Sequence, residues 1–129
     1  MGVTQIRSIA NEDPATTYIV FNRENPDDTG GPGQHLIINP GDNVQVRMWI
    51  PWCDNQKDFD DGHRIDFEAL GESGHVPPVT PNSYSVWQSG DYIYYSLDDN
   101  VGNRRLVAGN STINGDRSLA VTGTQIRIY

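Results

Sequence analysis

Apolar and polar residues alternate with a period of two in about ten short segments of the chain. Side chains on a β-strand point to opposite faces in turn, so this alternation is typical of strands with one buried face. No window of eleven or more residues keeps a helical apolar spacing without a Gly, a Pro or an Asn/Asp cluster interrupting it. The predicted strands are Val3–Ile9, Thr16–Asn22, Gln34–Ile38, Asn43–Ile50, His63–Leu70, Tyr84–Gln88, Tyr92–Leu97, Arg104–Ala108, Ser118–Val121 and Thr124–Tyr129.

Two of these segments predict which side chains face the core. In Asn43–Ile50, Trp49 falls on the polar, outward face with Gln45 and Arg47, and the predicted inward residues are Val44, Val46, Met48 and Ile50. In His63–Leu70 the predicted inward residues are Ile65, Phe67 and Ala69, and the predicted solvent-facing residues are Arg64, Asp66 and Glu68.

Glycine-aspartate steps precede three of the predicted strands, at Gly41-Asp42, Gly90-Asp91 and Gly115-Asp116. Glycine adopts the positive φ of tight turns without steric cost, so each step predicts a hairpin, and Asn114-Gly115 is the strongest signal. The unequal intervals between these glycines argue against a threefold β-trefoil repeat.

The tetrapeptide Thr4-Gln5-Ile6-Arg7 recurs as Thr124-Gln125-Ile126-Arg127. The two terminal strands therefore share a face pattern and could lie side by side, although chance recurrence explains the match equally well. Taken together, the patterns predict an all-β, antiparallel β-sandwich of the jelly-roll or immunoglobulin-like type, with roughly ten short strands and little or no helix. With 129 residues, one domain over 1–129 is expected.

Charge and composition narrow the classes of partner. Seventeen acidic and nine basic residues give a net charge of −8, which repels phosphate backbones, so nucleic acid is not an expected partner. No apolar stretch is long enough to span a membrane, and the first residues lack the plan of a signal peptide. The expected location is cytoplasmic, or secreted without a recognisable signal peptide. The one cysteine, Cys53, cannot form an intrachain disulfide.

The most concentrated group of carboxylates lies between Trp52 and His63. Calcium takes six to eight oxygen ligands, and a loop dense in carboxylates could supply them. No register of this loop fits the helix-loop-helix calcium motif, and a solvated acidic loop is the alternative interpretation. The candidate calcium ligands are Asp54, Asp58, Asp60 and Asp61.

The remaining reactive residues give no catalytic signature. His35, His63 and His75 lie far apart and lack the spacing of zinc sites. Cys53 precedes His63 by ten residues without a local nucleophile motif. A pair of carboxylates for glycoside hydrolysis cannot be identified in a chain with seventeen acidic residues, because any two of them at the right separation would serve. We therefore expect no enzyme, and a small hydrolase remains only a further alternative.

Aromatic residues gather around Asn43–Trp52 and Tyr84–Leu97. Aromatic faces pack against sugar rings, and neighbouring acids and amides can bond to hydroxyls, so the pattern favours carbohydrate. The same rings could instead fill the core of a sandwich. The candidate ligand-binding residues are Trp49, Trp52, Trp87, Asp58, Asp60, Asp61, His63 and Tyr92.

The tetrapeptide Ile50-Pro51-Trp52-Cys53 resembles the Cys-Pro-Trp element of the aegerolysins, small β-sandwich proteins that bind lipids. The order of residues differs and the resemblance covers only these positions, so it does not assign the chain to that family. It implies a membrane contact, and the acidic neighbours restrict that contact to glycans or neutral lipid headgroups.

The leading prediction is therefore a lectin-like, non-catalytic carbohydrate-binding module that presents loops Pro51–Gly62 and Ser83–Asp91 to a glycan or glycoconjugate, with calcium as a candidate cofactor. Because lectins gain avidity from several sites and this chain shows no repeat, a homo-oligomer is expected. The alternative is a lipid-binding or toxin-type assembly module whose strand edges pair with another chain or a membrane.

Overall fold

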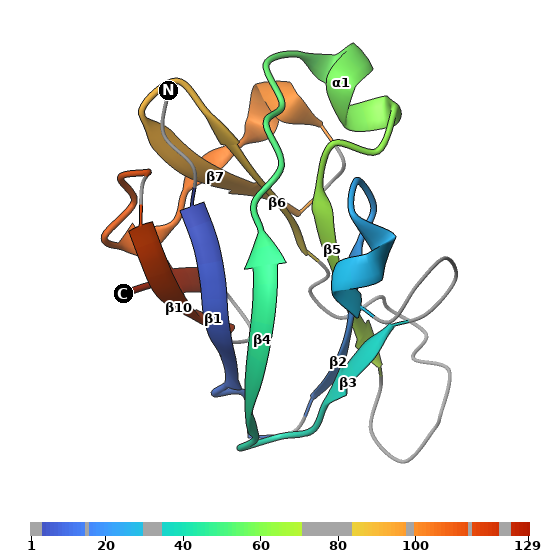
Figure 1. Ribbon diagram of the computed structural model, residues 1–129, viewed down its shortest axis with the longest axis vertical. Coiled ribbons are helices and arrows are strands. Elements are labelled where there is room, and N and C mark those ends of the chain that lie inside the picture. Colours follow the sequence, from blue (N-terminus) through green and yellow to red (C-terminus); the bar gives the residue numbers. More distant parts are fainter. Residues whose placement is uncertain are drawn as a thin grey trace.

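Two β-sheets enclose one hydrophobic core in the computed structural model (Figure 1), which describes residues 4–14, 16–29, 35–70, 84–97, 100–113, 115–121 and 125–129. The first sheet has the order β4-β1-β10-β11-β9 and the second the order β3-β2-β5-β6-β7-β8. The chain is thus an all-β sandwich, which confirms the predicted fold class.

The described residues form eleven strands and three short helical segments. The first sheet contains β1 (Thr4–Asn11), β4 (Asn43–Trp49), β9 (Ala108–Gly109), β10 (Gly115–Val121) and β11 (Ile126–Ile128). The second contains β2 (Thr17–Asn22), β3 (Leu36–Ile38), β5 (Ile65–Leu70), β6 (Tyr84–Ser89), β7 (Tyr92–Ser96) and β8 (Arg105–Leu106). The helical segments are α1 (Gln56–Asp60) and two turns of 3₁₀ helix, η1 (Pro26–Thr29) and η3 (Val101–Asn103).

One predicted strand is divided in the structure. Arg104–Ala108 gives β8 and β9, which belong to different sheets, because the chain crosses between the sheets at the buried residue Val107. This crossover closes one side of the sandwich.

The terminal strands do not lie side by side, which corrects the interpretation of the repeated tetrapeptide. Strand β10 stands between β1 and β11, parallel to β1 and antiparallel to β11. Strands β11 and β9 are also parallel, whereas every pair in the second sheet is antiparallel. The first sheet therefore mixes both directions, which corrects the prediction that the sandwich is antiparallel throughout.

Only one of the three glycine steps makes a hairpin between paired strands. Gly90, with φ of 59°, lies in the turn that joins β6 to β7. Gly41 instead lies between β3 and β4, which are in different sheets, and Gly115 is the first residue of β10, opposite Thr4. A glycine in the sequence predicts a positive φ, but it does not predict which strands the turn connects. Asn114 lies outside the described residues.

The predicted inward faces are largely confirmed. Met48, Ile50, Ile65 and Phe67 are buried in the core, and Trp49 is exposed on the outer face of β4. Asp66 is the exception, because it was predicted to face solvent and is buried. Its carboxylate accepts hydrogen bonds from Arg23 Nε at 2.7 Å, Arg64 Nε at 3.0 Å and Ser85 Oγ at 2.8 Å. These partners compensate the burial of the charge.

Asn11 links the two sheets at the end of β1. Its buried Nδ2 donates to Ile38 O at 3.0 Å and Thr16 O at 2.6 Å, and its Oδ1 accepts from Asp13 N at 3.0 Å. Removing an amide that satisfies several buried groups leaves those groups without partners.

Asn11→Ala is therefore expected to lower the free energy of unfolding by about 2–3 kcal/mol, measured by urea denaturation. The control is Asn43→Ala, at an exposed position, which should change stability by less than about 0.5 kcal/mol. Equal stability of both variants would show that the Asn11 link contributes nothing.

Candidate functional site

The two sides of the sandwich differ. One side is closed by the β8–β9 crossover, whereas on the other the edge strands β3 and β4 leave an opening that the segment η1 borders (Figure 1). A solvent-open groove of about 520 Å³ lies in this opening. It is lined by Asp27, Asp28, Leu36, Gln45, Val46 and Arg47.

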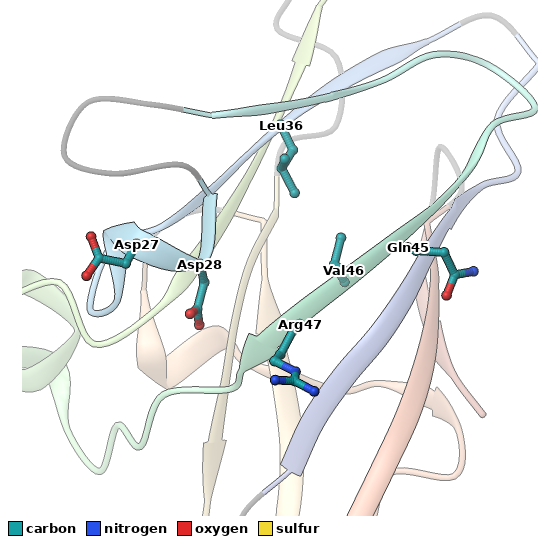
Figure 2. Close-up of a pocket in the computed structure, with 6 residues that line it drawn as sticks. All are labelled: Asp27, Asp28, Leu36, Gln45, Val46 and Arg47. Atoms are coloured by element: carbon teal, nitrogen blue, oxygen red, sulfur yellow. The ribbon is translucent and has the colours of Figure 1, made fainter.

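The groove has an apolar floor and a polar rim. Leu36 and Val46 point toward each other across it from β3 and β4 (Figure 2), and both pack against the core. Asp27 and Asp28 lie on the η1 side, and the side chains of Gln45 and Arg47 project from the opposite face of β4 to Val46. A ligand along this edge would meet apolar atoms in the groove and polar side chains beside it.

The backbone of β4 also faces the opening. Ile50 N donates to Thr4 O and Asn11 N donates to Asp42 O, so even-numbered residues at both ends of the strand turn their backbone groups toward β1. In an antiparallel pair the intervening residues direct their N–H and C=O groups to the other edge. Asn43 and Gln45 therefore present backbone donors and acceptors to the groove.

A hydrogen-bonded clamp fixes the Trp49 end of this edge. Trp49 N donates to Asp28 Oδ2 at 3.2 Å, and Trp49 O accepts from Asn22 Nδ2 at 3.1 Å. Asn22, only 1% exposed, also donates to Asp28 Oδ2 at 3.3 Å. The clamp joins β2, η1 and β4, and it thereby sets the separation of the groove walls.

Three polar side chains around the groove make no hydrogen bond or ion pair with the described residues. Within the described part of the chain, no hydrogen bond or ion pair involves the side chains of Asp27, Gln45 or Arg47. They bring a carboxylate, an amide and a guanidinium, which together can accept and donate hydrogen bonds. Trp49, 43% exposed, continues the outward row of Gln45 and Arg47 along β4. We call these four residues, with the floor of Leu36 and Val46, the edge site.

The four candidate calcium ligands all have partners within the protein, three of them in their own segment and one in β6. Asp54 Oδ1 accepts from Ser89 Oγ at 3.1 Å, and Asp58 Oδ2 accepts from Asp54 N at 3.1 Å. Asp60 Oδ1 accepts from Gln56 Nε2 at 3.0 Å, while Asp61 pairs with Lys57 at 2.8 Å, a contact that lowers the pKa of the Asp61 carboxyl. Among the described residues, no group of three His, Cys, Asp or Glu could hold a metal ion.

The acidic loop folds into helix α1 because its polar residues cap it. Asn55 Oδ1 accepts from Asp58 N at 2.9 Å, which makes Asn55 the N-cap, and Phe59 turns its ring into the fold. Helix α1 has five residues, too short to produce the periodicity by which a helix is recognised in a sequence. The acidic loop thus contains a short helix that Asn55 caps.

The other predicted ligand residues lie in separate places. Trp52 is half-buried beside β6, where it bridges to Gln88. Tyr92, 44% exposed, is on β7, and His63 Nδ1 lies 2.9 Å from Glu24 Oε1. Of the predicted set, only Trp49 belongs to the edge site.

Trp87, a candidate ligand-binding residue, follows the alternative interpretation that such rings fill the core. It is fully buried on the outer side of the second sheet, in a cluster with Cys53, Phe59 and Val101. Its ring meets that of Phe59 edge to face, with centroids 5.4 Å apart. Because α1 and η3 cover this part of the sheet, the Trp87 ring has no face free for a sugar.

Burial also controls the chemistry of Cys53. Loss of solvent raises the pKa of its thiol from 9.0 to about 11, and burial raises the pKa of Tyr18 from 10.0 to about 12. The folded state therefore holds protons that the unfolded state releases. The contribution of these groups to the free energy of unfolding is therefore fully present below their pKa values in the unfolded state. It is lost as the pH rises through their pKa values in the folded state.

We expect the free energy of unfolding, measured with urea from neutral pH to about pH 11, to decline above about pH 9. A Cys53→Ala variant should decline less steeply between about pH 9 and pH 11, because it lacks the thiol. Parallel curves for the two proteins would contradict a raised pKa at Cys53.

Sequence reasoning missed most of the edge site. Alternation in β4 correctly placed Gln45, Arg47 and Trp49 on one outward face, so a signal for these residues was available. Asp27 and Leu36 belong to the site only because η1 and β3 lie beside β4, and that arrangement is a property of the topology.

Comparison with known proteins found no matching family model, curated protein or solved structure. In the described residues, no helix has the length and apolarity needed to cross a membrane.

Proposed function

We propose that the chain is a lectin-like, non-catalytic module that binds a glycan at the edge site. The observation that carries this proposal is the group of unengaged side chains, Asp27, Gln45 and Arg47, around an apolar floor and beside an exposed indole. Sugars present apolar ring faces and hydroxyls that both donate and accept, so they suit a site that offers both kinds of surface.

The clamp supports the same function. A binding site gains affinity when its groups are held in place before the ligand arrives. Asn22 and Asp28 hold η1 against the main chain of Trp49, so the two walls of the groove are fixed without the help of a ligand.

The test is a glycan array that includes neutral and acidic structures, read with and without a chelator. Binding to a defined group of glycans supports the proposal. Loss of that binding with the chelator would add a calcium ion to the site. Absence of glycan binding, together with sedimentation on glycan-free vesicles of phosphatidylcholine and sphingomyelin, would replace the proposal with lipid binding.

A second candidate function is assembly with another chain through the sheet edges. It is favoured by the position of β3 and β4 as edge strands on the same side of the sandwich, because an unpaired edge is a template for strand addition. Sedimentation equilibrium would test it, and a homo-oligomer would also supply the avidity on which lectins rely.

A further inference from the structure

The outward row of β4 is longer than one sugar. Gln45, Arg47 and Trp49 project from one face at every second residue. Since a strand rises about 3.3 Å per residue, the Cα atoms of Gln45 and Trp49 are about 13 Å apart. A single pyranose ring stacked on Trp49 cannot also reach Gln45.

The surroundings of the row also extend along the strand. In the first sheet Gln5 lies opposite Trp49 and Ser8 lies opposite Gln45, and both residues are buried, so the exposed polar surface is that of β4 itself. On the other side of β4, the groove passes beside Gln45, Val46 and Arg47 and is open to solvent (Figure 2). An extended ligand parallel to β4 would keep contact with the site over its whole length.

Charge selects among extended glycans. The edge site contains one guanidinium, Arg47, and one carboxylate, Asp27, and the carboxylate of the clamp residue Asp28 lies beside it. The whole chain adds a net charge of −8, which repels an anionic polymer before it reaches the site. An uncharged glycan avoids this repulsion and can still bond to the carboxylates through its hydroxyls.

We propose, as an extension of the glycan-binding function above, that the edge site takes a linear, uncharged oligosaccharide lying along β4. One ring stacks on the Trp49 indole, the next is bonded by Arg47, and a further ring reaches Gln45. The ligand class is thus set by the length and charge of the strand edge.

The experiment compares the mono-, di-, tri- and tetrasaccharides of the neutral cello-, chito-, manno- and laminari- series by isothermal titration calorimetry. In the series that binds, the trisaccharide should bind about tenfold tighter than the monosaccharide, because it gains the bonds at Arg47 and Gln45. Gln45→Ala should weaken the trisaccharide severalfold and leave the monosaccharide unchanged, whereas Trp49→Ala should weaken both. Neither side chain has a bonding partner in the described fold that the substitution would break.

The outcomes separate this inference from the proposed function. A monosaccharide that binds as tightly as the longer sugars, or a preference for an acidic glycan on the array, would overturn the linear, uncharged ligand while leaving glycan binding intact. A chain that binds no glycan of any charge or length would overturn both.

Discussion

Replacing Trp87 with alanine is expected to lower the free energy of unfolding by about 3–5 kcal/mol, the usual cost of removing a large aromatic side chain from a core. The residue is 0% exposed and packs with Cys53, Phe59 and Val101 where α1 and η3 cover the second sheet. The cavity would therefore open inside the small cluster that attaches these two segments. Urea denaturation followed by circular dichroism would measure the effect.

Trp87→Phe provides the matched variant. The indole Nε1 is buried and has no hydrogen-bond partner in the described part of the chain, so its removal breaks no bond and relieves a desolvation cost. The smaller ring still leaves part of the volume unfilled, and we expect a loss of about 1–2 kcal/mol. A Phe variant as unstable as the Ala variant would show that the Nε1 group has a stabilising partner.

The contrast between Trp87 and Trp49 shows what the sequence could predict. Both residues lie in strands with alternating patterns, and the pattern in Asn43–Ile50 placed Trp49 outward correctly because its neighbours are polar. Trp87 lies on the outer face of its sheet, yet it is buried because α1 and η3 cover that face. Alternation assigns a side chain to one face of a sheet, but only the tertiary fold decides whether that face meets water.

The same limit explains the strand pairing. Nine of the ten predicted segments correspond to single strands, because period two is a local property of the chain. The parallel pairing of β1 with β10 and the position of η1 beside β4 depend on contacts between distant residues. The edge site is built from β3, β4 and η1, so it too depends on contacts between residues that are distant in the sequence.

Replacing Trp49 with alanine is expected to weaken glycan binding by about thirtyfold, equivalent to about 2 kcal/mol, because a partly exposed indole at a binding site carries much of the contact energy. Stability should change by less than about 1 kcal/mol. Asn22 and Asp28 bond to the main chain of Trp49 rather than to its ring, so the clamp survives the substitution. Calorimetric titration with the best glycan from the array would measure the loss.

Two matched variants locate the site by comparison. Trp52→Ala and Tyr92→Ala remove aromatic rings that lie beside β6 and on β7, in the second sheet, whereas Trp49 is in the first. If the glycan lies along β4, both variants should bind it as the unaltered protein does. A loss confined to these two variants, with Trp49→Ala unaffected, would place the glycan at the β6–β7 hairpin. It would refute the edge site, because Trp49 belongs to that site.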